Sequence, residues 1–195
     1  MRPDPVFPSA GGGGCRSFPP CANAAARVLI LGSMPGEESL RQRRYYAFPR
    51  NAFWRVMGEL CGFAPGAAPG VDPFAAAATV PYQKRLRAIQ ARGVALWDVL
   101  AACERDGSLD AAIRRPRPND VPGLMRACPR IALVCCNGGA AGRYLRRFFP
   151  EVAARAVVLP STSPAAAMFT YAEKLARWRE ALAPALLARP GQGRR

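Results

Sequence analysis

Four short apolar runs, each ending at a turn or a polar loop, constrain the fold of this chain more than any other feature. The runs lie at residues 27–31, 93–97, 131–136 and 156–159. Between them, apolar side chains recur at helical spacing, in segments 51–61, 82–91, 121–128, 139–149 and 164–182. Short buried strands that alternate with helices are typical of a parallel sheet covered on both faces. The sequence therefore predicts an α/β fold, a three-layer α/β/α sandwich with a central, mostly parallel four-stranded sheet.

The chain is long enough for one domain with its own core, without disulfide or metal staples. Residues 1–25 are rich in Gly, Pro, Ala and Ser and have no periodicity that could bury a face, so we expect a disordered leader. The folded domain is expected over residues 26–187, with a Gly/Pro-rich connector at 62–73. A basic, flexible tail is expected over residues 188–195.

The formal net charge is +15, and nearly all of the positive charge is arginine, since Lys84 and Lys174 are the only lysines. Such a charge favours a polyanionic partner, because each neutralised phosphate releases condensed counterions. A compositional bias that raises Arg, Ala, Pro and Gly together would produce the same charge without such a partner. The sequence has no secretory signal and no run of about 18 apolar residues, so we expect a soluble, cytoplasmic protein that does not enter a membrane.

The seven cysteines are scattered, form no Cys-x-x-Cys pair and have no histidine anywhere in the chain to join them. A zinc site is therefore not expected. Four of the cysteines could hold an iron–sulfur cluster, but burial as small apolar side chains is the commoner fate of such residues. We expect reduced thiols and no metal site.

Polar residues stand at or just after the end of each predicted strand. Residues 33–39 follow the first strand, Asp98 ends the second, Asn137 follows the third, and residues 161–163 follow the fourth. Right-handed crossovers place the carboxyl ends of parallel strands at one edge of the sheet. We therefore expect these residues to share a pocket with Asn51, which lies just beyond the first loop.

Two of these residues have simpler interpretations that the sequence leaves open. Asn51 stands where a helix begins, so its amide could serve only to cap the first turn. Asp98 could cap a helical turn over residues 99–103 instead of facing a ligand. Against these stand two observations: an amide among aromatic rings is costly to bury without a partner, and open α/β sheets bind ligands at the carboxyl ends of their strands.

The stretch around the first predicted strand end resembles a known family. Gly-Ser-Met-Pro-Gly (32–36), Ser-Leu (39–40) and Tyr-Tyr-Ala-x-Pro-x-Asn-x-Phe-Trp (45–54) are similar to the first motif of the uracil-DNA glycosylase superfamily. Within it, the resemblance is greatest to the hypoxanthine-DNA (DNA-deoxyinosine) glycosylase branch. The second motif resembles Leu-Pro-Ser-Thr-Ser-Pro-Ala (159–165), and residues 93–113 are also similar to that branch. The resemblance covers residues 27–182.

The resemblance implies a monofunctional DNA glycosylase of base excision repair. Such an enzyme flips a deaminated base out of double-stranded DNA and hydrolyses its N-glycosidic bond. The implied substrate base is hypoxanthine, in deoxyinosine, with uracil or xanthine as further candidates. No metal and no cofactor is implied, and a monomer is expected to act. A mismatch-specific uracil or thymine glycosylase and a non-catalytic DNA-binding relative are the alternatives. The matched motifs hold no lysine, which speaks against a Schiff-base intermediate and strand cleavage.

The resemblance also implies roles for single residues. Asn51 would orient the attacking water or contact the junction of sugar and base, because Met34 stands where other branches carry an acidic or amide residue, and a thioether cannot polarise water. Asp98 would accept the lactam N–H of the base, and Ser33 completes the catalytic set. Residues implied to bind the base are Met34, Pro35, Gly36, Phe48 and Asn137. Residues implied to contact DNA are Ser39, Arg50, Ser161, Thr162, Ser163 and Pro164. Ala166 stands where a polar residue is common in the family.

Overall fold

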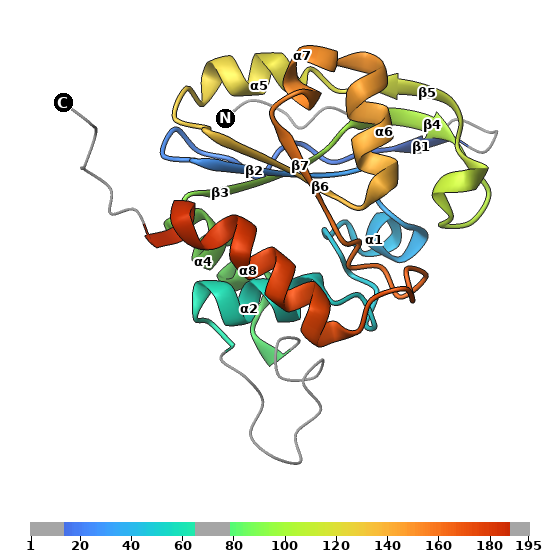
Figure 1. Cartoon of the computed structure of the whole chain (residues 1–195). Helices are drawn as coiled ribbons and strands as arrows, with labels where there is room; N and C mark the ends of the chain where they lie inside the picture. The colour runs from blue at the N-terminus through green and yellow to red at the C-terminus, as the bar shows by residue number, and fades with distance from the viewer. Residues whose placement is uncertain (1–13, 65–78, 188–195) are drawn as a thin grey trace, which may run out of the picture.

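A four-stranded parallel sheet lies at the centre of the computed structural model, which describes residues 14–64 and 79–187 (Figure 1). Its strand order is β3-β2-β6-β7, and every neighbouring pair is parallel. The strands are β2 (Val28–Gly32), β3 (Val94–Asp98), β6 (Leu133–Asn137) and β7 (Ala156–Leu159). The predicted parallel sheet is confirmed, and each strand lies close to its predicted run.

Helices cover both faces of this sheet, as Figure 1 shows. One face carries α2 (Phe53–Cys61), α4 (Tyr82–Ala91) and α8 (Tyr171–Leu187). The other face carries α5 (Val121–Ala127), α6 (Gly139–Phe148) and α7 (Pro150–Ala153). The three-layer α/β/α architecture is therefore confirmed. In the described part of the chain, no helix has the length and apolar character needed to cross a membrane.

The central strand β2 is buried on both faces, which explains why its sequence is a continuous apolar run. Val28 and Ile30 belong to the core cluster that includes Trp178, whereas Leu29 and Leu31 belong to the cluster on the opposite face. All of these side chains are fully buried. A strand covered on both faces needs apolar residues at every position, which removes the alternation of a half-exposed strand.

A second, smaller sheet was not predicted. It is antiparallel, has the order β1-β4-β5, and consists of β1 (Gly14–Arg16), β4 (Leu100–Glu104) and β5 (Arg114–Pro118). The helical turn considered for residues 99–103 is wrong, because these residues continue β3 into β4. The backbone N–H groups of Val99 and Leu100 donate to the carbonyls of Gly32 and Ser33, which keeps this segment extended.

The expectation of a disordered leader over residues 1–25 is wrong for its second half. Gly14–Arg16 pairs with β4, and Cys21 forms a bridge to Leu96 at the outer edge of β3. The partners in these backbone hydrogen bonds are about 80 residues away in the chain, so the local sequence pattern does not predict this pairing. The folded domain therefore begins before residue 26. Residues 1–13, the predicted tail 188–195 and most of the 62–73 connector lie outside the described residues.

Two helices differ from expectation near the predicted pocket. The last helix begins at Tyr171 and not at residue 164, because the segment before it forms loop structure, and it runs past Pro184 to Leu187. Lys174 on this helix is buried, and its Nζ donates to the carbonyl of Ser163 at 3.4 Å. A short helix α1 (Glu37–Gln42) occupies the predicted loop after β2.

Candidate active site

The carboxyl ends of the parallel strands open onto a cavity of about 280 Å³. Thirteen of the residues predicted for the site line it: Ser33, Met34, Pro35, Gly36, Ser39, Phe48, Asn51, Asp98, Asn137, Ser161, Thr162, Ser163 and Pro164. Arg50 is the predicted residue that does not, and its guanidinium lies 5.8 Å from the centre of the Phe48 ring. The structure thus gathers residues from four separate loops, as the edge of a parallel sheet allows.

Asp98 lies at the end of β3, directly beside Gly32 at the end of β2. Its side chain is 3% exposed, and burial raises the pKa of this carboxyl from its ordinary value to about 7. The carboxyl Oδ1 occupies the space that a Cβ at position 32 would need. Gly32 is therefore required for Asp98 to reach the cavity.

Two residues outside the predicted set hold Asp98 in place. Ser17, from the supposedly disordered leader, donates its hydroxyl proton to Asp98 Oδ2 at 2.8 Å. Asn119 donates its side-chain amide to the Asp98 carbonyl at 2.9 Å. The Ser17 hydrogen bond favours the charged carboxylate and so opposes the effect of burial on its pKa. Neither partner could be identified from the sequence, because each is brought in by tertiary structure.

Asn51 serves the start of α2 and lines the cavity at the same time. Its Oδ1 accepts a hydrogen bond at 3.0 Å from the backbone N–H of Phe53, the first residue of α2, although the N-cap position itself is Ala52. Its side-chain Nδ2 has no acceptor within residues 14–64 and 79–187. The helix start is therefore one residue later than the capping interpretation had it, but the side chain of Asn51 still binds the first N–H of α2, and the other end of its amide is available in the cavity.

Ser33 is paired with a carboxylate that the sequence did not single out. Its hydroxyl donates to Asp110 Oδ1 at 2.5 Å. Asp110 begins the 3-10 helix η1 (Asp110–Ala112), in the connection between β4 and β5. The neighbouring Ser108 accepts a hydrogen bond from the backbone N–H of Glu37 at 2.9 Å, which fixes this connection against the loop after β2. A second acidic side chain thus lines the cavity.

An aromatic wall closes one side of the cavity. Tyr46, also missed by the prediction, stacks on Phe53 with ring centres 3.8 Å apart. Burial, and then the charge of Asp98, raise the pKa of the Tyr46 hydroxyl well above its usual range, so it remains a neutral donor. Tyr46 has a φ of 53°, an uncommon backbone conformation for a residue other than glycine. Phe48 follows and remains 40% exposed.

The loop after β7 is held in place on several sides. Asn137 binds Thr162 twice: its Nδ2 donates to the Thr162 hydroxyl and its Oδ1 accepts from the Thr162 N–H, both at 2.9 Å. The Thr162 carbonyl accepts from Ala52 N–H, and Trp178 Nε1 donates to the carbonyl of Pro160 at 2.9 Å. Thr162 is only 1% exposed. Thr162 therefore has an internal role in holding this loop, and its predicted DNA contact stays a prediction.

The two serines of the same loop remain accessible to a ligand. Ser161 Oγ accepts from the N–H of Ser163, and Ser163 Oγ accepts from the N–H of Ala165. Each hydroxyl is used as an acceptor in these contacts, which leaves its own proton free to be donated. The side chains of Ser161 and Ser163 are only partly buried, in contrast to Thr162.

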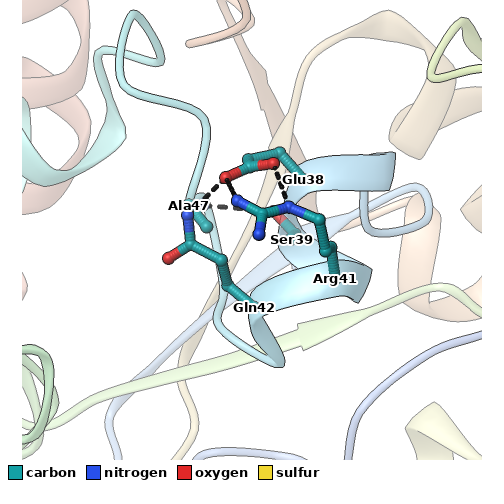
Figure 2. A network of polar contacts seen from close by, with 5 residues as sticks. All are labelled: Glu38, Ser39, Arg41, Gln42 and Ala47. Carbon is teal, nitrogen blue, oxygen red and sulfur yellow. Dashed lines mark hydrogen bonds and ion pairs between the residues drawn. The ribbon is translucent and has the colours of Figure 1, made fainter.

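Ser39 has an internal role as well, and its predicted DNA contact stays a prediction. Its buried hydroxyl accepts from the Ala47 N–H at 3.1 Å and ties α1 to the aromatic segment (Figure 2). Next to it, Arg41 and then Gln42 donate to Glu38 and lower the pKa of that carboxyl to about 2. Glu38 lines the cavity, but its charge is neutralised by Arg41.

Metal ligands do not gather at this site. Within the described ranges, no group of three or more Cys, Asp or Glu residues could hold a metal ion. All seven cysteines are free thiols, and five of them are buried. The arrangement instead offers two side-chain amides, three carboxyl groups, of which Glu38 is paired with Arg41, and several backbone and hydroxyl donors around one cavity. Such a set can bind and orient a polar heterocycle and a water molecule.

Comparison with known proteins agrees with this arrangement. The model of the uracil DNA glycosylase superfamily matches residues 19–186. The chain belongs to this superfamily.

Relatives carry a more specific name. A protein of Methanosarcina acetivorans named hypoxanthine DNA glycosylase is 35% identical over 155 residues, which cover 80% of this chain and 90% of that protein. A protein of Methanosarcina barkeri with the same name is 34% identical over 129 residues, 66% of this chain and 74% of the relative. The solution NMR structure of a candidate uracil DNA glycosylase from Methanosarcina acetivorans matches with a TM-score of 0.71 and 31% identity, covering 88% of this chain and 98% of that one.

Proposed function

We propose that this protein is a monofunctional DNA glycosylase that removes deaminated bases, with hypoxanthine in deoxyinosine as its main substrate. One observation carries the proposal: the side-chain amide of Asn51 and the buried carboxyl of Asp98 line the same cavity, at the edge where the strands of the sheet end. The names of the two Methanosarcina relatives support the choice of hypoxanthine.

Asp98 is proposed to recognise the base. Hypoxanthine and uracil both present a lactam N–H, which an ionised carboxyl accepts as a strong, charge-assisted hydrogen bond. The side chain is 3% exposed, so this bond would form away from competing water. A base without an N–H at that position would leave a buried charge unpaired, which disfavours its binding.

The Pro35–Gly36 peptide is proposed to bind the carbonyl oxygen of the base. Arg105, 4% exposed, donates from Nη2 to the Pro35 carbonyl at 2.5 Å and fixes the orientation of this peptide. The carbonyl and N–H of a trans peptide point in opposite directions. The Gly36 N–H therefore points away from Arg105 and can stabilise negative charge as the base departs.

Asn51 and Asp110 are proposed to share the work on water and sugar. Asn51 positions the attacking water with its free amide nitrogen, while Oδ1 holds the start of α2. A neutral amide cannot take a proton, and Met34 supplies no acid at the strand end. Asp110 brings a carboxylate to the same cavity from η1, where it can stabilise the positive charge that develops on the sugar.

A substrate panel tests the function. Duplexes that carry one inosine, uracil or xanthine are incubated with excess protein and then cleaved with alkali at any abasic site. We expect the highest single-turnover rate on inosine, with Asn51→Ala as the control that removes activity. No cleavage on any of the three substrates would disprove a glycosylase. Borohydride treatment should trap no covalent complex, since neither lysine lines the cavity.

We further propose that the protein acts as a monomer on double-stranded DNA in the cytoplasm. The described chain builds the whole cavity by itself, and its net charge of +15 suits a phosphate backbone. Light scattering of the free protein and of its complex with an inosine duplex is expected to give one chain in each. A dimer on DNA would contradict the proposal.

A further inference from the structure

A second cavity, of about 180 Å³, shares a wall with the proposed active site. The shared wall is formed by Tyr45, Tyr46, Phe48 and Asn51, each of which lines both cavities. The remaining lining comes largely from α2, α4 and the turn after α1. The proposed catalysis assigns no role to this second cavity.

Three arginines line the second cavity, and one of them, Arg55, is paired with Glu59. Arg44, Arg55 and Arg85 line it, and none of its described lining residues is acidic. The guanidinium groups of Arg44 and Arg85 lie 5.6 Å and 5.7 Å from the centre of the same Tyr82 ring. Neither of these two arginines forms an ion pair with a carboxylate in the described part of the chain. Two cations thus lie near one aromatic ring without a counterion from the described residues.

Of these two arginines, Arg85 is the more buried. Its guanidinium lies 5.0 Å from the Trp54 ring, and its Nε is buried without a hydrogen-bond partner. Burial lowers the pKa of Arg85, and the charge of Arg44 lowers it further. A buried donor without a partner and a neighbouring like charge both destabilise the free protein. An anion in the cavity would relieve both.

We propose that this second cavity binds a backbone phosphate of the DNA strand whose flipped nucleotide enters the first cavity. The inference rests on the proposed glycosylase function. Phe48, 40% exposed, lies on the wall between the two cavities, so a strand that crosses it would present its base to one side and a phosphate to the other. Arginine suits this role, because its planar guanidinium can donate two hydrogen bonds to one phosphate.

The salt dependence of binding tests the assignment. Dissociation constants are measured over a range of salt concentrations for an undamaged duplex and for a duplex with a tetrahydrofuran abasic-site analogue. Each lost phosphate contact reduces the magnitude of the slope of log K against log salt, where K is the binding constant, by about 0.7 to 0.9. We expect Arg44→Gln and Arg85→Gln each to lose about one such contact on the analogue duplex. The double variant should lose no more than either single variant, because both arginines bind one phosphate.

Arg130→Gln is the matched control, because it removes the same charge from an exposed site just before β6, at the opposite edge of the sheet. Arg44 is exposed, so its variant keeps the test valid if Arg85→Gln fails to fold. Slopes for the Arg44 and Arg85 variants equal to that of Arg130→Gln would overturn the proposal. If inorganic phosphate then raised the melting temperature of the wild type but not of the variants, the cavity would bind free phosphate. The slopes do not depend on base excision, so a negative substrate panel would leave this test intact.

Discussion

Ser17 donates a hydrogen bond to the carboxylate of Asp98 at 2.8 Å, although 81 positions separate the two residues. β1 pairs antiparallel with β4, and this pairing brings the next residue, Ser17, to the end of β3. The segment that looks like a leader thus contributes to the proposed base-binding residue. In a glycosylase that uses Asp98 as an acceptor, the leader would help set the pH at which the enzyme works.

Ser17→Ala is expected to shift the pH dependence of excision. The Ser17 hydrogen bond lowers the pKa of Asp98, so its loss raises that pKa above the present value of about 7. Only the charged carboxylate can accept the N–H of the base, so the excision rate rises as the pH passes the pKa of Asp98. In Ser17→Ala, this rise is expected at a pH about one unit higher. Single-turnover rates from pH 5 to 9 measure the shift. Ser17→Thr keeps the hydroxyl and should restore the wild-type profile, whereas an unmoved profile in Ser17→Ala would contradict the role of Asp98.

Asp98→Asn is expected to raise stability at high pH while it removes hypoxanthine excision. The folded-state pKa of Asp98 lies above its ordinary value of 3.8, so the native protein binds the proton more tightly than the unfolded chain. The proton bound to Asp98 therefore contributes to the free energy of unfolding at low pH, and this contribution is lost as the pH rises from about 4 to about 7. Asp98→Asn has no carboxyl group to ionise, so at pH 8 its free energy of unfolding should exceed that of the wild type by on the order of 1 kcal/mol or more. Urea unfolding of both proteins at pH 4 and pH 8 checks the sign; an equal difference at both pH values would refute it.

Two substitutions at Asn51 should separate its roles. Asn51→Ala removes both the cap on Phe53 N–H and the free amide, so we expect about 1 kcal/mol lower stability and at least a roughly 100-fold lower excision rate. Asn51→Ser retains a capping hydroxyl and should unfold like the wild type, yet lose a similar factor in rate. Chemical denaturation and single-turnover excision measure the two effects. Full activity in Asn51→Ser would assign Asn51 to structure alone.

Asp110→Asn tests the second carboxyl group. The amide can still accept from Ser33, so the hydrogen bond at the end of β2 survives while the negative charge is lost. We expect the single-turnover rate on inosine to fall by roughly 100-fold, with affinity for an abasic-site duplex nearly unchanged. Ser33→Ala serves as the comparison that removes the hydrogen bond but leaves the charge. A larger effect of Ser33→Ala than of Asp110→Asn would show that orientation, and not charge, matters at this position.

Gly32→Ala is expected to disable the site through a steric conflict. A Cβ at this position would collide with the Asp98 carboxyl, which would have to leave its place. The backbone conformation itself needs no glycine, so overpacking of about 1 to 3 kcal/mol is the cause of the lost stability. Gly139→Ala in α6 is the matched control, since its nearest contact is the flexible Arg143 side chain and alanine favours a helix. Equal thermal stability and activity in both variants would contradict this view of Gly32.

Much of the fold could be predicted because the signals are local. Each strand of the central sheet is a continuous apolar run, and β2 is buried on both faces as such a run requires. The ends of these runs place Asp98 and Asn137 at the same edge of the sheet, on strands β3 and β6, with β2 between them. The small sheet is different, because β1 and β5 have no apolar pattern of their own. Both owe their extended conformation to hydrogen bonds with β4.

The sequence by itself determined the parallel sheet, the edge at which its loops meet, and the presence of Asn51 and Asp98 there. Only the tertiary structure decided which partners hold these residues: Ser17 on Asp98, Asp110 on Ser33, and a buried Lys174 behind the loop of Ser163. The physical reason is the range of the interactions. Periodicity records which face of an element is buried, whereas a hydrogen bond between distant segments leaves no trace in the local pattern of either one.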